Sequence, residues 1–284
     1  MKKLYRFSAI ALLVLPLIFT SCSDYLDRDD DDNITEADVF ARYEKVNDVY
    51  AAAKKADRPL VFFEHFSNSA ITDECEGTNV EGNITNNFNN GAWNPNSLPG
   101  SVGQYWEALY EGIRKANLII ENVQKYNTPD NPQQDGDLRN RIGEMYFMRG
   151  YFHMLLLRMY GEAPYIDRVI NAGDNMDFKK ESVHSMVEKI VTDAQTAYGM
   201  VPNKYVKTSE NFGRVDKGAC LGLISFVRWV AATPLWNGAS QYGYNLRRVF
   251  ENEYAYDATR WRKAKEAAKA VLDFEVGGTK RYSL

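Results

Sequence analysis

The chain has 284 residues, of which 45% are hydrophobic and 25% are charged, and its formal net charge is −4 at pH 7. A chain of this length can bury a substantial core, in one domain or in two closely packed ones. The acidic balance argues against nucleic acid as a partner, because phosphate binding needs a basic surface.

The N-terminus has the pattern of a secretory signal. Three basic residues among the first six precede an apolar run over residues 9–19. This run is too short for a membrane span, which needs about 20 apolar residues. Removal of residues 1–21 would take away these three basic residues and leave 31 basic and 38 acidic ones, a formal charge near −7.

Cys22 follows this run directly after two small residues, which is the substrate geometry of lipoprotein processing, although Phe19 stands where leucine is usual. The sequence therefore predicts a signal peptide at 1–21 and acylation of Cys22. Acyl chains contribute about 0.8 kcal/mol per buried methylene, so two or three chains anchor a protein in membrane lipid almost permanently. The acidic residues of 22–33 predict a solvated, extended tether.

Helical spacing of apolar residues recurs in six later segments. The expected helices are 36–53, capped by Thr35 and Asp38, then 102–123, 137–160, 182–198, 215–232 and 257–274. The third helix is apolar on two faces, so we expect it to be buried on two sides. Because no segment alternates like a strand, the sequence predicts a mainly α fold, most simply a solenoid of antiparallel helix hairpins. The uneven spacing of the helices does not match a regular repeat of about 34 residues.

A long irregular insertion, roughly 56–100, separates the first two helices, and insertions of this length are usually functional. It holds eight asparagines between Asn79 and Asn96, and Trp93 stands between Asn90 and Asn94. A flat aromatic ring can stack on a sugar while nearby amides hydrogen-bond its hydroxyls. Trp93, Asn90, Asn94 and Asn96 are therefore our candidate glycan-binding residues. The alternative is that Trp93 packs the insertion onto the helices and the asparagines form turns.

Catalysis has little support in the sequence. The three histidines, His65, His153 and His184, are widely separated, and no metal-ligand spacing, nucleophile elbow or phosphate loop is present. We expect His153 to be a hydrogen-bonded core residue and His184 to be exposed. The chain is therefore predicted not to be an enzyme, and to carry no metal and no cofactor other than a covalent lipid on Cys22.

The acidic cluster in the insertion is expected to be solvated, and the two other cysteines are expected to be unpaired. Asp73, Glu74 and Glu76 are adjacent in sequence, which does not place two acids about 5–9.5 Å apart across a sugar, so we expect solvated surface acids. A calcium site is a minor alternative with too few ligands. Cys75 and Cys220 are expected to be separate thiols, although an oxidising compartment would permit a disulfide.

The tryptophans outside the insertion are expected to pack in the core. Trp106, Trp236 and Trp261 lie in helical motifs, and Trp229 lies among the apolar residues of the fifth helix.

Four segments resemble the SusD/RagB-type nutrient-binding lipoproteins. They are Cys22–Asp27, similar to a C-x-D-Y-L-D start, then Trp106–Ile120, then Glu144–Pro164, which ends on Y-G-x-x-P, and Gly213–Ala219 with its continuation through Ala232–Gly238 and Trp261–Ala264. They occur in the right order along nearly the whole mature chain. The acidic start is also similar to the export signal of Bacteroidetes lipoproteins, which implies display on the outer face of the outer membrane.

This resemblance implies a tetratricopeptide-containing α fold and a surface lipoprotein that captures glycans, or in some members peptides, for nutrient uptake. It also implies a SusC-type TonB-dependent transporter as partner and a sugar-stacking aromatic residue in the insertion. Family members are about twice as long as this chain, so residues 34–284 are expected to be the N-terminal helical domain of a fragment or of a truncated product. The alternative functions are a helical-repeat adaptor or peptide-binding lipoprotein and, more remotely, a secreted hydrolase.

Overall fold

The computed structural model describes residues 35–54, 62–63, 66–72, 74, 88–92, 94, 96, 100–127, 132–209, 211–238 and 251–283. The chain divides into two compact units, Met1–Val39 and Phe40–Leu284. The expected signal peptide, Cys22 and the acidic tether all lie outside the described residues.

The described part of the chain is mainly helical, as the sequence predicts. Its α-helices are α2 (Glu36–Phe40), α3 (Tyr43–Lys54), α5 (Gly100–Tyr126), α6 (Pro132–Tyr160), α7 (Val183–Met200), α8 (Lys217–Ala232) and α9 (Ala258–Leu272). Two 3-10 helices, η3 (Asn68–Ile71) and η5 (Glu251–Tyr254), accompany them. Two antiparallel hairpins pair β1 (Phe62–Phe63) with β2 (Phe66–Ser67), and β3 (Glu275–Val276) with β4 (Thr279–Lys280).

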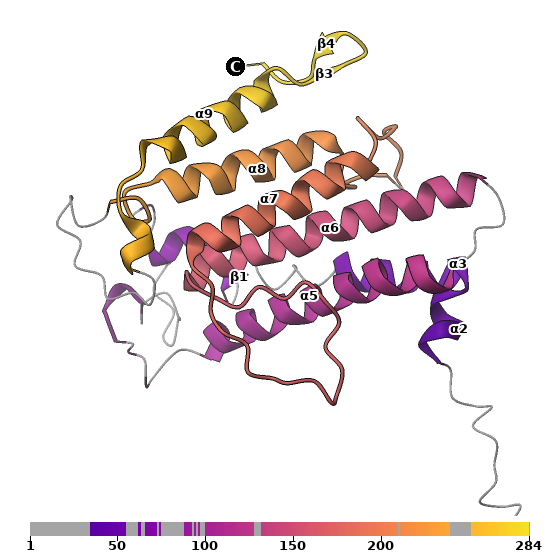
Figure 1. The fold of residues 1–284 in the computed structure, drawn as a ribbon, viewed down its shortest axis with the longest axis horizontal. Helices are drawn as coiled ribbons and strands as arrows, with labels where there is room; N and C mark the ends of the chain where they lie inside the picture. Colours follow the sequence, from indigo (N-terminus) through magenta and orange to yellow (C-terminus); the bar gives the residue numbers. More distant parts are fainter. Residues whose placement is uncertain are drawn as a thin grey trace, which may run out of the picture. The chain divides into compact units, whose positions relative to one another are not determined.

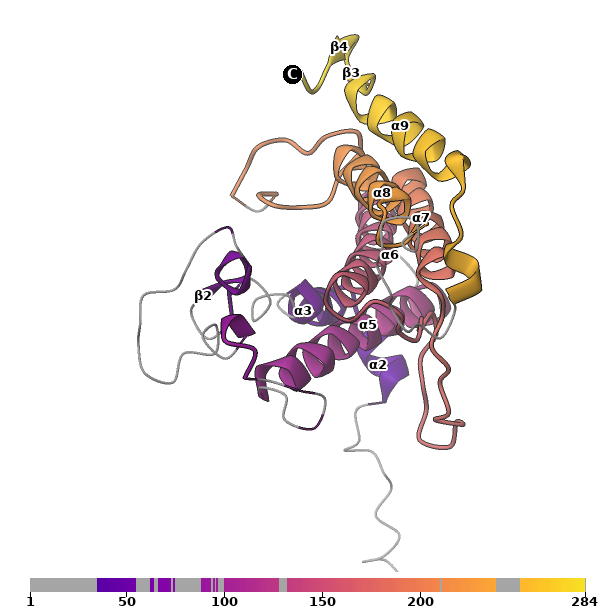
Figure 2. The same ribbon diagram turned by 90° about the vertical axis from the view of Figure 1, so that its left-hand side faces the viewer.

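The helices α5 to α9 run alternately in opposite directions, and each packs against the next (Figure 1). Figure 2 shows α6, α7 and α8 nearly end on, as successive members of this stack. The helix α6 contacts α5 on one side and α7 on the other, which confirms its predicted burial on two sides. This arrangement is the predicted stack of antiparallel helix hairpins.

The core lies between these helices and is built from the predicted apolar positions. Its largest fully buried apolar side chains come from five helices: Val46, Leu109, Ile113, Ile119, Met145, Phe152, Leu156, Met186 and Ile190, with Cys220 and Val227 from α8. Burial of such side chains is the main favourable contribution to folding.

The first predicted helix is interrupted, which corrects the expectation of one continuous helix. Its N-terminus is capped as predicted, because the Asp38 carboxylate accepts a hydrogen bond from the Thr35 amide (3.0 Å) and the Thr35 hydroxyl accepts one from the Asp38 amide (3.2 Å). However, the carbonyl of Phe40 accepts a hydrogen bond from the Asn127 side chain (2.9 Å). The helix ends at this carbonyl, and the chain restarts as α3 at Tyr43.

The other helices agree with the predicted segments to within a few residues. The largest difference is at α6, which begins at Pro132, because proline is well suited to the first turn of a helix. The helices α7, α8 and α9 begin after Ser182, Asp216 and Asp257, whose side chains accept hydrogen bonds from amides of the first turn.

Two of the four tryptophans expected in the core are exposed. Trp106 is partly buried and packs on Tyr160, with ring centroids 5.1 Å apart, and Trp236 is also partly buried. In contrast, Trp229 is 51% exposed and Trp261 is 43% exposed, so the prediction was wrong for both. The helix α9 is the last of the stack and packs mainly on α8, which leaves much of its surface uncovered.

A buried carboxylate joins α3, α6 and the connection between α7 and α8. Glu144 on α6 has no exposed surface and accepts hydrogen bonds from the hydroxyls of Tyr50 and Tyr205 (2.8 Å for Tyr205) and from Nε of Arg214 (2.8 Å). Burial opposes the charge of Arg214, but Glu144 more than compensates and raises its pKa. Two residues of the family-like segments therefore form a buried ion pair.

Candidate functional site

One face of α5 holds the backbone of the following connection. The side chains at positions 110, 114, 117 and 121, spaced by four, three and four residues, all bond to the 163–170 segment, which follows α6. These bonds are Tyr110 hydroxyl to Pro164 O (2.8 Å), Arg114 Nη1 to Ile170 O (2.6 Å), Asn117 Nδ2 to Arg168 O (2.9 Å), and Val169 N to Glu121 Oε1 (2.7 Å). The segment is thus fixed in place without regular secondary structure.

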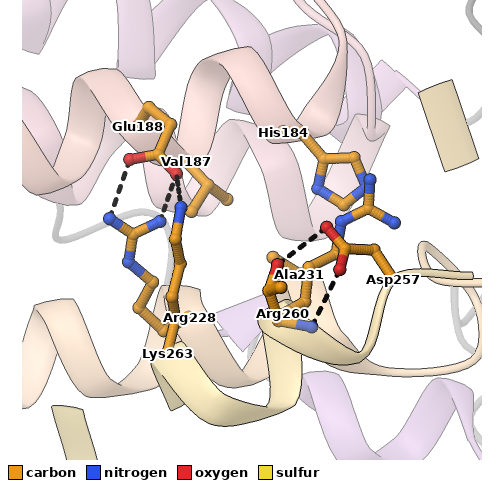
Figure 3. A pocket seen from close by; sticks show the side chains of 9 residues that line it. His184, Val187, Glu188, Arg228, Ala231, Asp257, Arg260 and Lys263 are labelled. Carbon is orange, nitrogen blue, oxygen red and sulfur yellow. Dashed lines mark hydrogen bonds and ion pairs between the residues drawn. The ribbon is translucent and has the colours of Figure 1, made fainter. Parts of the chain in front are cut away.

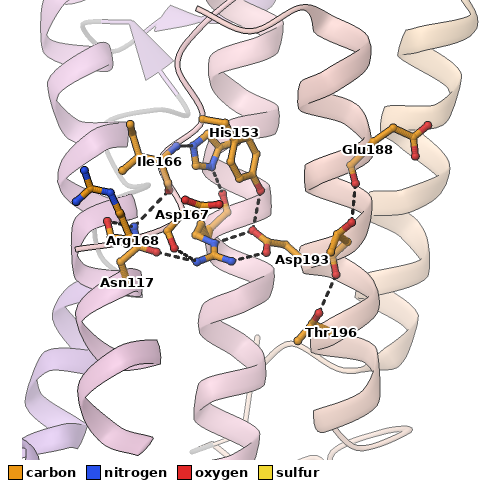
Figure 4. Close-up of polar contacts among 11 residues, drawn as sticks. Asn117, His153, Ile166, Asp167, Arg168, Glu188, Asp193 and Thr196 are labelled. Atoms are coloured by element: carbon orange, nitrogen blue, oxygen red, sulfur yellow. Dashed lines mark hydrogen bonds and ion pairs between the residues drawn. The ribbon is translucent and has the colours of Figure 1, made fainter. Parts of the chain in front are cut away.

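A buried ion pair between α6 and α7 holds the same segment from the other side (Figure 4). Arg149 donates to both carboxylate oxygens of Asp193, at 2.7 and 2.5 Å, and both side chains are more than nine-tenths buried. Its remaining terminal nitrogen donates to Asn117 Oδ1 and to the carbonyl of Asp167, each at 2.9 Å. Burial opposes the charge of Arg149, but Asp193 outweighs this effect and raises its pKa.

His153 completes this network as a neutral core residue, as the sequence predicts. Its Nδ1 lies 2.8 Å from the carbonyl of Arg149, and its Nε2 accepts a hydrogen bond from the amide of Ile166 (3.0 Å). The ring stacks on Tyr165 with centroids 3.7 Å apart. Burial lowers the pKa of His153 to about 3, so the ring cannot serve as an acid or base near neutral pH.

The 163–170 segment and α5 line an open cavity of about 570 Å³, which we call the α5 cavity. Its lining residues are Tyr110, Ile113, Arg114, Ile166, Arg168, Ile170, Asn171, Ala172 and Met176. The size lies within the range of small-molecule sites, about 300–1,000 Å³. Sequence reasoning did not find this cavity, because its walls come from segments about 55 residues apart (110 with 164, 114 with 170).

A smaller cavity of about 200 Å³ lies between α7, α8 and the start of α9 (Figure 3). There Glu188 accepts hydrogen bonds from Arg228 (2.7 Å) and Lys263 (3.0 Å), and Arg228 contributes most to lowering the Glu188 pKa to about 2. Arg260 donates to the carbonyls of Ala255 (2.6 Å) and Glu253 (2.9 Å). The contacts of Glu188 join the three helices, and those of Arg260 hold the segment that precedes α9.

His184 lines this smaller cavity, so the expectation that it is exposed was wrong. Its Nε2 lies 2.8 Å from the carbonyl of Trp236, and the side chain is only partly exposed. Burial lowers the pKa of His184 to about 4, and Arg260 adds to this effect. The imidazole is therefore neutral and donates from Nε2 to that carbonyl.

The insertion between α3 and α5 exposes the predicted asparagines. Asn90, Asn94 and Asn96 are all exposed, whereas Trp93 lies outside the described residues. The side-chain Oδ1 of Asn94 accepts a hydrogen bond from the backbone N–H of Asn96 (2.9 Å), which is a turn contact. Within the described part of the chain, the side chains of Asn90 and Asn96 form no hydrogen bond. These two amides are available to a ligand.

The described residues contain no group of three or more His, Cys, Asp or Glu side chains placed to hold a metal ion. Glu74 is exposed, while His65, Asp73 and Glu76 lie outside the described residues. Cys220 is a buried free thiol whose pKa burial raises to about 12, and Cys75 lies outside the described residues. Among the helices in the described ranges, none is long and apolar enough to cross a membrane.

Comparison with known protein families identifies the family to which this chain belongs. A family model for SusD-like proteins, described as "Starch-binding associating with outer membrane", matches residues 24–227, more than two thirds of the chain. The chain belongs to the SusD-like family. The match includes Arg149, Asp193 and Arg214, so both buried ion pairs lie within the part shared with the family.

This SusD-like chain also matches individual relatives. It is 28% identical over 129 residues to SusD-like protein P2 of Formosa agariphila, which covers 45% of this chain and 24% of that protein. A SusD homologue from Bacteroides thetaiotaomicron has a TM-score of 0.59 and 20% identity, covering 88% of this chain and 43% of that one. A SusD-like carbohydrate-binding protein from Bacteroides fragilis has a TM-score of 0.60 and 13% identity, covering 83% and 41%. The two structures show a shared fold, and the chain spans less than half the length of each relative.

Proposed function

We propose that this chain is the helical part of a non-catalytic, glycan-binding lipoprotein of the outer membrane. The observation that supports this function most is the match over residues 24–227 to a family described as starch-binding and associated with the outer membrane. The exposed amides of Asn90 and Asn96 offer hydrogen-bonding groups in the insertion where the sequence places Trp93. Trp93 would then provide the apolar platform for a sugar ring.

Uptake would need a transporter, and a SusC-type TonB-dependent barrel fits a lipoprotein held at the membrane surface. A lipid on Cys22 would confine the protein to the plane of its partner, which raises the effective concentration of each for the other. Solubilised in a mild detergent, the protein should co-purify with such a barrel. Recovery without any barrel would instead favour a helical-repeat adaptor.

The glycan-binding proposal is tested by Trp93→Ala, with binding to starch and to its oligosaccharides measured by calorimetry on the full chain. Stacking of a base on an aromatic side chain is worth about 1–3 kcal/mol, and we expect a similar loss of affinity here, roughly 5- to 150-fold. The free energy of unfolding should change little, because a solvent-facing platform contributes little to the core.

Trp229→Ala is the matched control, because Trp229 is exposed and lies on α8, outside the insertion. This variant should keep the affinity of the wild type. If Trp93→Ala lowers the stability by about 3–5 kcal/mol and the folded fraction binds unchanged, Trp93 is a packing residue and leaves the candidate site.

A further inference from the structure

The walls of the α5 cavity are poorly suited to a sugar. Ile113, Ile166 and Ile170 line it with aliphatic groups, and the hydroxyl of Tyr110 already donates to the carbonyl of Pro164 (2.8 Å). Hydroxyls of a sugar that face the isoleucines would lose the hydrogen bonds that they make with water, which costs affinity. The cavity is therefore better suited to a ligand with an apolar body.

The charge of the cavity is positive. Two of its lining residues are arginines, and none of them is an aspartate or a glutamate, although the whole chain has a formal charge of −4. Arg168 is paired with Asp174 at 2.7 Å. Arg114 forms no ion pair with the residues that the structure describes, and it makes one hydrogen bond, to the carbonyl of Ile170. Since a guanidinium has five N–H donors, most of those of Arg114 are available.

The cavity is also preformed. The 163–170 segment is bonded to four side chains of α5, and Arg149 and His153 of α6 hold it from the other side. A preorganised wall reduces the ordering cost of binding. Met176, which also lines the cavity, is 68% exposed, and its flexible side chain can adapt to an apolar ligand.

We propose that the α5 cavity binds a small amphipathic carboxylate. Its aliphatic body lies against the three isoleucines, and its carboxylate pairs with the guanidinium of Arg114. Arginine suits this role because its planar guanidinium can bind a carboxylate through two parallel hydrogen bonds. This site is separate from glycan binding in the insertion and does not depend on it.

The test is calorimetric titration of the full chain with sodium octanoate and, separately, with octanamide, which has the same chain but no charge. Octanoate should bind about two- to fivefold more tightly, because Arg114 is exposed and an exposed ion pair contributes modestly. Arg114→Gln should remove this preference. Arg139→Gln is the matched control, because Arg139 also donates to a backbone carbonyl, that of Gly199 (3.1 Å), and lies outside the cavity.

Arg114→Gln also removes the bond to Ile170, so a second variant keeps Arg114 in place. Ala172→Glu adds a carboxylate to the exposed rim of the cavity, where it should weaken binding of octanoate by about two- to fivefold and leave that of octanamide nearly unchanged. Equal affinity for octanoate and octanamide, binding of neither, or an equal loss in Arg139→Gln would overturn the proposal. Loss of starch binding in Arg114→Gln would also overturn it, because the cavity would then belong to a glycan site.

Discussion

At the scale of single residues, the buried pair of Arg149 and Asp193 determines how firmly α6, α7 and the 163–170 segment are joined. Asp193→Asn leaves the Arg149 guanidinium buried without its counter-charge. Breaking a buried pair in this way typically costs about 3–5 kcal/mol, and we expect a loss of that size in the free energy of unfolding, measured by urea titration.

The control for this loss is an ion pair at the surface. Lys115 and Glu111 are paired one helical turn apart on α5, with side chains that are 29% and 63% exposed. Because exposed pairs contribute little, Lys115→Met should change the stability by less than about 1 kcal/mol. Similar losses of unfolding free energy in Asp193→Asn and Lys115→Met would mean that the buried pair contributes no more to stability than the exposed one.

His153 gives the stability a defined dependence on pH. Burial lowers its pKa to about 3 in the folded chain, while the ordinary value, about 6.5, applies when the chain is unfolded. The unfolded chain therefore binds more protons than the folded one below pH 6.5. The contribution of His153 to stability is fully present above about pH 6.5 and falls towards pH 3, by up to about 1.4 kcal/mol per pH unit.

Urea titrations between about pH 6.5 and 5 measure this slope before most carboxylates are protonated. His153→Gln removes the titrating group, so the slope of this variant should be smaller than that of the wild type by up to the stated amount. Equal slopes in the two proteins would exclude His153 as the origin of the pH dependence.

At the scale of elements, a glycine of α6 permits close packing against the C-terminal end of α7. A Cβ added at Gly143 would lie 2.6 Å from Cβ of Met200 and 3.0 Å from Cγ1 of Val201. Gly143→Ala should therefore force the two helices apart and lower the free energy of unfolding by about 1–3 kcal/mol, as overpacking does. Thermal or urea unfolding measures the change.

Gly136 on the same helix is a matched control, since a Cβ there meets nothing within 4 Å. Gly136→Ala should raise the stability by up to about 1 kcal/mol, because glycine is a poor helix former. The two substitutions are chemically identical and should have opposite signs. Equal effects would contradict the close packing of α6 on α7 at Gly143.

The helices could be predicted because their apolar residues recur at helical spacing and their caps are local. The break between α2 and α3 could not, because it depends on Asn127, 87 residues from Phe40. The exposure of Trp229 was missed for a similar reason, since the local pattern shows that a helix is apolar but not which face a neighbour covers. Local signals determine the helices and their caps, and distant contacts determine which faces are covered.

At the scale of the whole molecule, the same division holds for the candidate sites. The exposed asparagines of the insertion were found from sequence, because the length and the asparagine content of a loop are visible in the sequence alone. The α5 cavity was not found, because it combines α5 with the connection after α6. The residues of the segment Glu144–Pro164 were recognised as a family resemblance, but the partners of Glu144 and Arg149 are 70 and 44 residues away.

We expect the location of the whole molecule to depend on Cys22, which gives the last prediction. If Cys22 is acylated, Cys22→Ala should be exported but recovered in the soluble fraction, and it should not incorporate labelled palmitate. Cys220→Ala is the matched control, because Cys220 is completely buried in the core and cannot carry a lipid anchor in the folded protein. This variant should stay in the membrane fraction until detergent is added and should incorporate label like the wild type. Retention of Cys22→Ala in the membrane fraction would mean that another part of the protein provides the attachment.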